Sequence, residues 1–309
     1  MRAPLRVALG GGGSDLPSYY AEHGGLVVST AIDRYVTITV AEHPERFVLD
    51  HLEREEVDDP AEVRHPILRA ALTHHWSGGG LELASSGDAP PGTGLGSSGA
   101  YAVCTIKALA ELDGRELDAG ELAEAASHLE IELVGRSIGK QDQYASAFGG
   151  VRAYTFHPDG AVDARQLSLT EEMRAALRER FLLFFTGRQR SASQILGAGQ
   201  DEQAVHRLKQ VAGETCAALE SGDLDAVAGL MQEHWEAKRR RIPGAVTPEM
   251  EQLRERALRA GAGGVISLGA GGGGFLLVYS PDPDRMRAAL AGVDELEFGL
   301  DETGCTTLS

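Results

Sequence analysis

The stretch GDAPPGTGLGSSGAYA, residues 87–102, decides the fold. Its alternating glycines, Gly92, Gly94 and Gly96, reach backbone conformations closed to other residues and let backbone amides approach an anion. The apolar segment that follows predicts a helix from Ser97, whose first N–H groups and positive dipole end also favour an anion. We therefore expect a polyphosphate to bind over Pro91, Gly92, Thr93, Gly94, Leu95, Gly96, Ser97 and Ser98. The alternative is an ordinary loop before a core helix.

Composition restricts what the partner can be. With 309 residues, 42% of them hydrophobic, the chain can bury a large core, and we expect two domains. A formal charge of -17 argues against nucleic acid or an anionic membrane surface as partner, because both need a basic face. A small ligand fits better. If that ligand is a nucleotide, its binding to an acidic protein requires local positive charge from Mg²⁺, a helix N-terminus and a few basic side chains at the site.

Cysteine usage and the N-terminus indicate a cytoplasmic protein. Cys104, Cys216 and Cys305 are odd in number and widely spaced, which predicts neither a disulfide framework nor a zinc site. The run Pro4–Leu9 resembles a strand and carries no signal-peptide pattern, and no apolar stretch approaches about 18 residues. A homodimer is compatible with the sequence.

Periodicity predicts an α+β chain in two parts. In the first part, short β-type runs predict strands at Leu5–Leu9, Leu26–Ile32, Tyr35–Val40, Leu81–Ser85 and Val151–Phe156. Between them, helical patterns cover Val63–Trp76, Ser97–Leu112 and Leu122–Val134. The second part has helices at Ala192–Ser221, Leu224–Arg240 and Pro248–Ala260 and strands at Phe181–Phe185, Gly264–Ser267, Phe275–Tyr279 and Glu295–Phe298. We expect its sheet to be covered on one face and the boundary to lie between Gly160 and Glu171.

Two further segments carry charged residues beside glycines. In APLRVALGGGGSDLP, residues 3–17, Arg6 stands inside a predicted strand and could pair with a carboxylate or phosphate, while Asp15 could accept hydrogen bonds from substrate hydroxyls. In EIELVGRSIGKQDQY, residues 130–144, Asp142 follows a glycine-containing loop and could take a proton from an acceptor hydroxyl. A glutamate, Glu130 or Glu132, could hold Mg²⁺ with a serine of the loop. A turn aspartate, an edge arginine and a solvated helix face are the ordinary alternatives.

A third glycine cluster, GAGGVISLGAGGGGFLLVY, spans residues 261–279. It contains a formal GxGxxG match, but a short β-type run follows it, whereas the dinucleotide-binding fingerprint needs a helix. We expect a strand, a glycine loop and a strand. The loop either lets two backbones pack closely or presses the main chain of the second domain against the first phosphate loop, and the two interpretations are compatible. Gly271 and Gly272 are the candidate nucleotide contacts there.

Basic residues outside these clusters are weaker candidates. Arg188 and Arg190 follow a β-type run and could bind an anionic part of the substrate, as could Lys140. The segment HWEAKRRR, residues 234–241, ends a predicted helix, where cations suit the helix dipole without any ligand.

The three ordered glycine clusters resemble the GHMP kinase superfamily, which includes galactokinase and the homoserine, mevalonate and phosphomevalonate kinases. The finer motifs KQDQYASAFGG, HWEAK and LGAGGGGFLL are most similar to its branch of D-glycero-D-manno-heptose 7-phosphate kinases. The resemblance covers nearly the whole chain. It implies an N-terminal domain like ribosomal protein S5 domain 2 (residues 1–165) and a ferredoxin-like C-terminal domain (166–309), with ATP and a sugar or sugar phosphate between them.

The resemblance also implies roles for single residues. Asp142 corresponds to the catalytic aspartate and Arg6 to the arginine that stabilises it. Glu130 matches the Mg²⁺ carboxylate, with Ser98 as its hydroxyl partner, and Asp15 matches the aspartate that binds sugar hydroxyls. The implied activity is ATP-dependent phosphorylation of a hydroxyl, the anomeric one being favoured.

The chain departs from the superfamily pattern at two places. Gly12 and Gly13 stand in the substrate loop where galactokinases carry Glu-His, which disfavours galactose. Gly99 replaces the usual alanine or serine at the start of the helix. A kinase for another sugar or for a non-sugar alcohol, and a nucleotide-binding regulator, are the alternative functions.

Overall fold

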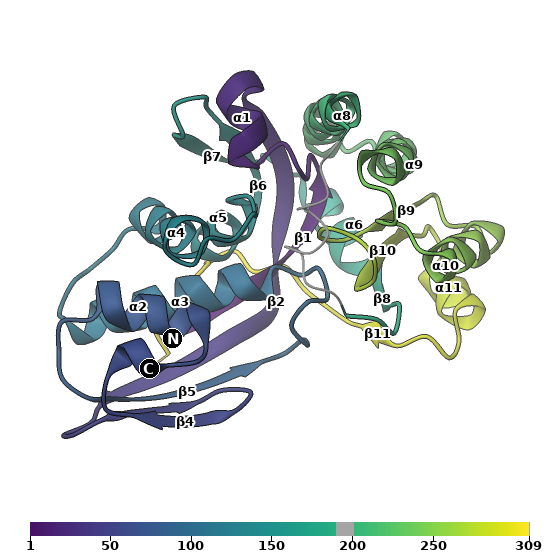
Figure 1. Cartoon of the computed structure of the whole chain (residues 1–309). Coiled ribbons are helices and arrows are strands. Elements are labelled where there is room, and N and C mark those ends of the chain that lie inside the picture. The colour runs from purple at the N-terminus through teal and green to yellow at the C-terminus, as the bar shows by residue number, and fades with distance from the viewer. Residues whose placement is uncertain (190–200, 309) are drawn as a thin grey trace.

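The computed structural model describes residues 1–189 and 201–308, and its strands form two separate sheets (Figure 1). The first sheet has the order β4-β3-β5-β2-β6-β7, and β1 pairs with β2 outside that path. Its strands are β1 (Arg2–Gly10), β2 (Gly25–Glu42), β3 (Phe47–Asp50), β4 (Arg54–Val57), β5 (Leu81–Gly87), β6 (Val151–Phe156) and β7 (Val162–Gln166). The runs predicted as two strands around Asp33 form one long strand, β2, which pairs with β1, β5 and β6.

Helices cover one face of this sheet (Figure 1). They are α1 (Pro17–His23), α2 (Pro66–His75), α3 (Ser97–Leu112), α4 (Ala119–His128) and α5 (Gln141–Phe148), with a 3₁₀ turn at Pro60–Glu62. The helix predicted over 122–134 instead starts at a capping box on Asp118 and ends in a π-helical turn, Leu129–Leu133. Such turns widen the helix and re-aim side chains, which matters below for Glu130.

The second sheet is antiparallel, in the order β11-β8-β10-β9. Its strands are β8 (Phe181–Phe185), β9 (Gly264–Ser267), β10 (Phe275–Tyr279) and β11 (Glu295–Leu296), and the helices of this part are α6 (Glu171–Glu179), α8 (Glu202–Ser221), α9 (Leu224–Arg241), α10 (Pro248–Arg259) and α11 (Pro283–Ala289). The start predicted for α8, at 192, lies outside the described residues.

Our expectation that one face of this sheet is covered was wrong. Leu182 and Phe184 belong to one buried cluster with Trp235 and Met250, while their neighbours on β8, Phe181 and Leu183, are buried in the main core. Because successive side chains of a strand point to opposite faces, both faces are buried. The second face is apolar because it packs against the core shared with the first sheet.

The chain end returns to the first sheet, so the two parts are not simply consecutive. Arg2 pairs with Thr306 and Ile32 with Leu300, which places the two termini close together (Figure 1). The strand β7 ends at Gln166, beside the predicted division at 165/166, and that division stays a prediction, which does not include this return. The α+β architecture in two parts is confirmed.

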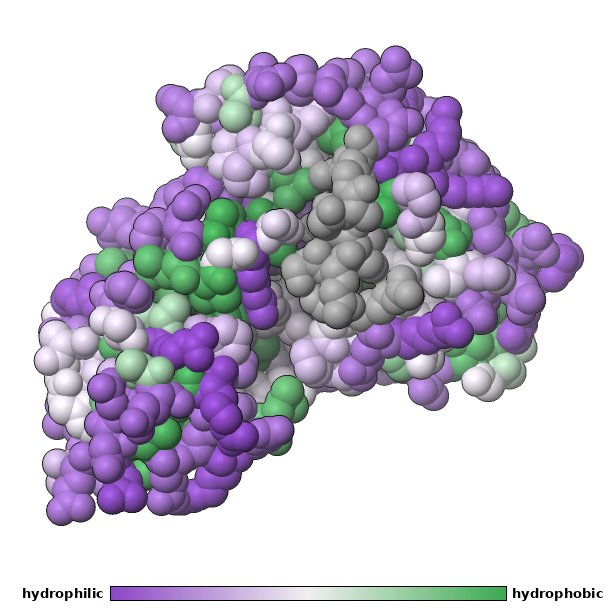
Figure 2. Space-filling view, in the orientation of Figure 1, coloured by the Kyte–Doolittle hydropathy of each residue, from purple (hydrophilic) through white to green (hydrophobic). Residues whose placement is uncertain are grey.

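Hydrophilic residues cover most of the face drawn in Figure 2, as the composition leads one to expect. Among the described helices, none combines the length and apolar character needed to cross a bilayer.

Candidate active site

A cavity of about 960 Å³ lies between the two sheets. The loop before α3, the end of β1, the start of α5, the end of α9 and the third glycine cluster all contribute to its wall. It therefore collects most of the residues that the sequence singled out. Lining residues from the predicted site are Arg6, Gly12, Gly13, Asp15, Pro91, Gly92, Gly94, Gly96, Ser97, Ser98, Asp142 and Gly271.

The loop before α3 has the conformation that its glycines predict. Gly92, Gly94 and Gly96 have φ of 74°, 84° and 75°, a region that other residues rarely enter. Gly96 is the N-cap of α3, and no side chain caps the helix. The first N–H groups of α3 therefore point toward the cavity without a capping partner. Thr93 and Leu95 are buried and do not line the cavity; the Thr93 hydroxyl donates to Pro90 O at 2.8 Å. These two residues shape the loop rather than face a ligand.

The third glycine cluster presses against this loop, as predicted. A Cβ added at Gly274 would lie 2.3 Å from Thr93 O, and one at Gly269 would lie 2.7 Å from Gly94 Cα. The Phe275 amide donates to Thr93 O at 3.0 Å. The glycines on both sides are thus needed for backbone to meet backbone. Gly272 does not line the cavity, since its amide donates to Ala245 O at 2.7 Å, so only Gly271 of the predicted pair faces it.

Arg6 and Asp142 form an ion pair beside the loop. Arg6 is buried in β1, and its Nε and Nη2 donate to Asp142 Oδ1 at 2.8 and 2.6 Å. Its Nη1 donates to Gly94 O, which ties the pair to the phosphate loop. Within the described residues Asp142 Oδ2 has no hydrogen-bond partner, and the side chain is 30% exposed. The carboxylate is thus held in place through one oxygen and presents the other.

The close packing of α3 against α5 explains why position 99 is a glycine. A Cβ added there would lie 2.6 Å from Asp142 Cβ and 3.0 Å from the Gln143 amide nitrogen. Alanine would therefore push α5, and Asp142 with it, away from α3. We expect Gly99→Ala to lower kcat by about tenfold or more, because a misplacement near 1 Å is costly at a reacting centre. Steady-state kinetics with an ATP-binding titration would check this; unchanged kcat would show that α5 can shift freely.

Glu130, and not Glu132, contacts Ser98 of the phosphate loop, although it does not itself line the cavity. The Glu130 side chain is fully buried and the π-helical turn directs it toward α3, whereas Glu132 is exposed. Glu130 Oε1 accepts hydrogen bonds from the Ser98 hydroxyl at 2.6 Å and from Arg136 Nη1 at 2.7 Å, and Oε2 accepts from Gln143 Nε2 at 2.6 Å. Burial raises the pKa of Glu130, and the Ser98 and Arg136 contacts oppose that rise. A hydroxyl and a carboxylate oxygen form a donor set suited to Mg²⁺.

Arg136 supplies the positive charge at this place. Its Nη1 donates to Ser98 Oγ at 3.0 Å as well as to Glu130, so a cation already contacts both predicted metal ligands. Nothing in the sequence around Arg136 predicts this role. A metal ion held by the same two oxygens would have to displace the guanidinium, because Arg136 uses both as hydrogen-bond acceptors.

We therefore expect Arg136→Met to bind Mn²⁺, used as a reporter for Mg²⁺, about tenfold more tightly in the presence of ATP. Tenfold corresponds to the lower end of the range for a hydrogen bond to a charged group. Electron paramagnetic resonance of free Mn²⁺ measures the affinity directly, independent of turnover. Arg115→Met, on the exposed surface, serves as the control. Weaker Mn²⁺ binding in Arg136→Met would mean that the arginine assists the metal site.

Asp15 also lines the cavity, beside the start of α5. Its Oδ1 accepts the Gly13 amide at 2.9 Å and its Oδ2 accepts the Gln141 amide at 3.4 Å, which links the substrate loop to the start of α5. Burial raises the pKa of Asp15 above its usual value, and the nearby negative charge of Asp142 raises it further. Two carboxylates therefore face the same space.

The loop glycines before Asp15 make room for Arg241. A Cβ added at Gly13 would lie 2.6 Å from Arg241 Nη1, and this atom donates to Gly12 O at 2.6 Å. A histidine at position 13, as in the Glu-His pair of galactokinases, would have to displace this arginine. Gly12 itself has open space around it and lines the cavity.

Three basic residues of α9, His234, Lys238 and Arg241, reach the cavity together. Their spacing puts them on one helix face, and all three are buried. Burial lowers the pKa of His234 to about 3 and that of Arg241 to about 10, and it lowers the pKa of Lys238. The predicted helix end with cations in its last turn is confirmed, but Lys238 and Arg241 are also buried at the cavity, which that interpretation did not include. Their burial is decided by the second sheet, which the local sequence does not reveal.

These basic residues are incompletely satisfied. Lys238 Nζ donates to the carbonyls of Ser267, at 2.5 Å, and Gly269, at 2.7 Å, so it also holds the third glycine cluster. His234 Nδ1, Arg241 Nε and Ser267 Oγ are buried without a hydrogen-bond partner among the described residues. Within 4.0 Å of Lys238 or Arg241 the described part of the chain places no carboxylate oxygen. The cavity wall here favours an anion.

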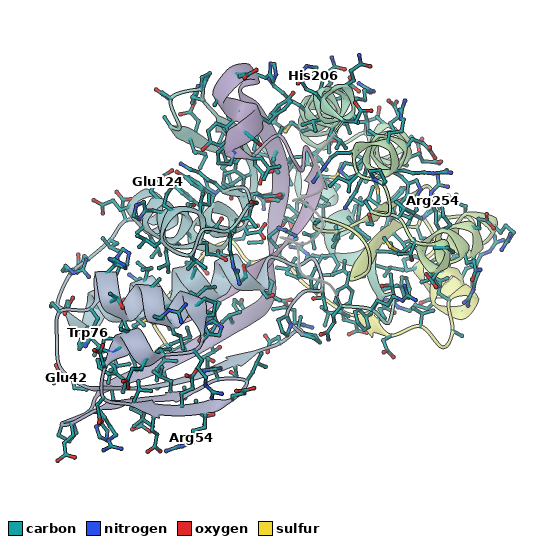
Figure 3. The ribbon with its side chains drawn as sticks, in the orientation of Figure 1. Glu42, Arg54, Trp76, Glu124, His206 and Arg254 are labelled. Atoms are coloured by element: carbon teal, nitrogen blue, oxygen red, sulfur yellow. The ribbon has the colours of Figure 1, made fainter. Side chains whose placement is uncertain are left out.

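Two predicted substrate residues are not brought to the cavity. Lys140 Nζ donates to both carboxylate oxygens of Glu124, labelled in Figure 3, and to Gly160 O. Arg188 lies 3.4 Å from Glu249 and is largely exposed. Neither residue lines the cavity, because each is held by a carboxylate elsewhere. Arg190 lies outside the described residues.

Comparison with known proteins identifies the family. The GHMP kinases N terminal domain matches residues 65–150, and the GHMP kinases C terminal domain matches residues 216–296. The chain belongs to the GHMP kinase family. The first match contains the phosphate loop, Glu130 and Asp142, and the second contains the α9 basic residues and the third glycine cluster. This chain is accordingly an ATP-dependent kinase of small molecules.

The chain is similar to heptose phosphate kinases, and in fold to a phosphomevalonate kinase, over nearly its whole length. The D-glycero-alpha-D-manno-heptose 7-phosphate kinase of Campylobacter jejuni is 28% identical over 92% of this chain and 89% of its own length. The crystal structure of a D-glycero-D-manno-heptose 1-phosphate kinase from Bacteroides thetaiotaomicron superposes with a TM-score of 0.80 at 25% identity, covering 100% of this chain and 99% of that one. The Streptococcus pneumoniae phosphomevalonate kinase gives a TM-score of 0.81 at 18% identity, over 97% and 99% of the two chains, which shows the shared fold.

Proposed function

We propose that this GHMP kinase transfers the γ-phosphoryl group of ATP to a hydroxyl, the anomeric one, of a sugar phosphate, with D-glycero-D-manno-heptose 7-phosphate as the first candidate. The observation that carries the proposal is the Asp142 carboxylate, held by Arg6 through one oxygen and open to the cavity through the other. A carboxylate so placed can take the proton of an acceptor hydroxyl. The similarity to heptose phosphate kinases supports the choice of acceptor.

The nucleotide phosphates bind over the glycine loop. The N–H groups at the start of α3 and the amides of Gly92, Gly94 and Gly96 supply hydrogen bonds without side chains. Ser98 and Glu130 would hold Mg²⁺, which neutralises charge on the transferring phosphates. Arg6 reaches both the base and the loop, so it stabilises the charge that develops between them.

The acceptor lies between Asp142 and the end of α9. Asp15 accepts hydrogen bonds from sugar hydroxyls, since it lines the cavity and keeps acceptor capacity beyond its two amide contacts. Arg241, with His234 and Lys238 beside it, binds the phosphate that the acceptor already carries. A phosphate dianion offsets the cost of burying the Arg241 charge and supplies a partner for Arg241 Nε and His234 Nδ1.

The direct test measures ADP release with ATP and Mg²⁺ over matched acceptors: heptose 7-phosphate, mannose, mannose 6-phosphate, fucose and galactose. Turnover with a phosphorylated sugar, and much weaker turnover with unphosphorylated ones, is the expected result. Equal or better turnover with fucose would assign an unphosphorylated sugar instead. ATP binding without turnover on any member of the panel would contradict the sugar kinase and favour a non-sugar acceptor or a regulator.

A further inference from the structure

Outside the cavity, two histidines and a glutamate gather where α1 meets α8. His23 ends α1, and Glu202 and His206 lie one turn apart at the start of α8. One ligand atom from each residue falls within 4.8 Å of the other two. In Figure 3 His206 is labelled on α8 at the top of the molecule, near α1. None of the three residues lines the active-site cavity.

Their separations suit one metal ion. Glu202 Oε1 lies 3.3 Å from His23 Nε2 and 3.5 Å from His206 Nε2. A tetrahedral Zn²⁺ with bond lengths of about 2.0–2.2 Å separates its ligand atoms by roughly 3.3–3.5 Å. The imidazole rings meet edge to face, at 88°, so each ring can direct its nitrogen to a point between them. The side chains are 30%, 63% and 43% exposed for His23, Glu202 and His206, which leaves a path for an ion and a water ligand.

The surroundings orient these ligands. Tyr19 Oη lies 2.5 Å from His206 Nδ1, so the other ring nitrogen, Nε2, is the one left to bind an ion. Lys209 Nζ donates to the His23 carbonyl at 2.6 Å and fixes the end of α1 on α8. Glu22 Oε2 lies 3.7 Å from His23 Nε2 and adds negative charge at the same place. A hydrogen bond to the second ring nitrogen of a histidine, as Tyr19 makes here, is typical of metal-binding histidines.

We propose that His23, Glu202 and His206 bind a divalent transition metal, Zn²⁺ being the best match, with water as the fourth ligand. Two imidazoles and one carboxylate suit Zn²⁺, whereas Mg²⁺ prefers oxygen ligands alone, so this site is separate in place and chemistry from the nucleotide metal. The ion ties α1 to α8. The helix α1 directly follows the substrate loop, which contains Gly12 and Asp15, and α8 packs against Gly10 and Gly11 through Ala212. By joining α1 to α8, the metal stabilises the position of the substrate loop.

Competition with a chromophoric zinc chelator, in excess Mg²⁺, tests the site on the full chain. We expect one Zn²⁺ bound per chain, His206→Ala to weaken it by at least about 100-fold, and Tyr19→Phe by about tenfold. His74→Ala removes an exposed histidine of α2 and should leave the affinity unchanged. Co²⁺ should give the visible absorption of a four-coordinate ion, lost in His23→Ala. Thermal unfolding without metal shows that each variant folds.

Equal Zn²⁺ affinity of the parent protein and His206→Ala, or a weak octahedral Co²⁺ spectrum that His23→Ala does not change, would overturn the proposal. Occupied Zn²⁺ should also raise Tm by about 4 °C at a 100-fold excess over Kd in the parent but not in His206→Ala. An equal rise in both would place the ion elsewhere.

Discussion

Asp142→Asn is expected to lower kcat by about 10²–10⁴-fold while leaving ATP affinity nearly unchanged. The substitution keeps the shape of the side chain but removes the open carboxylate oxygen as a proton acceptor. Because Arg6 also donates to Gly94 O, the phosphate loop keeps its contact with β1 in the variant. Single-turnover phosphoryl transfer and an ATP titration would separate the two effects.

Asp163→Asn is the matched control, since this aspartate is exposed on β7 and pairs with His157 away from the cavity. It should retain the parent kcat. Retention of most activity in Asp142→Asn would contradict the assignment of the base. Loss of ATP binding together with kcat would instead show that the Arg6–Asp142 pair mainly holds the phosphate loop.

Arg241→Met should raise KM for a phosphorylated acceptor by about 10–100-fold, and change KM for ATP much less. The range corresponds to losing a hydrogen bond to a charged group, about 1.5–3 kcal/mol. With the matched unphosphorylated sugar, the variant and the parent should differ little. Steady-state kinetics on the pair mannose 6-phosphate and mannose measures this difference, because only the phosphate distinguishes the two acceptors.

Arg239→Met, two residues earlier on α9, removes a 60% exposed arginine and serves as the control. A large rise in KM for ATP in Arg241→Met would show that the buried cations contact the nucleotide phosphates. An equal rise in KM for both sugars would show that the arginine acts through the Gly12 carbonyl, by positioning the substrate loop. A thermal unfolding measurement excludes a general loss of folding.

Local sequence determined the secondary structure near the site with few errors. The predicted bounds of α3, β6, β8, β9 and β10 match the structure, because each segment has strong periodicity and ends at glycine, proline or a turn. The phosphate loop was also predictable, since alternating glycines before a helix have a local reason in backbone conformation. The π-helical turn was not predictable, as its residues look like an ordinary helix.

Contacts between distant segments decided the rest. The residues alone left Glu130 and Glu132 both open, and only the family resemblance favoured Glu130. The packing of the π-helical turn on α3 buries Glu130 and exposes Glu132. Lys140 was predicted at the substrate, but the carboxylate of Glu124, sixteen residues earlier in the chain, holds it outside the cavity. A charge can be read from a sequence, whereas its partner is chosen by the fold.

The sequence by itself therefore determined the family, the phosphate loop and the Arg6–Asp142 candidates, because those depend on residue types at fixed spacing. The tertiary structure decided which cations meet the ligand. Lys238 and Arg241 end an ordinary amphipathic helix, and they face the cavity only because α9 packs on the second sheet and the Gly12–Gly13 backbone leaves space. The gathering of His23, Glu202 and His206 likewise exists only where α1 meets α8. Burial and proximity are properties of the folded chain, and they set the chemistry of these groups.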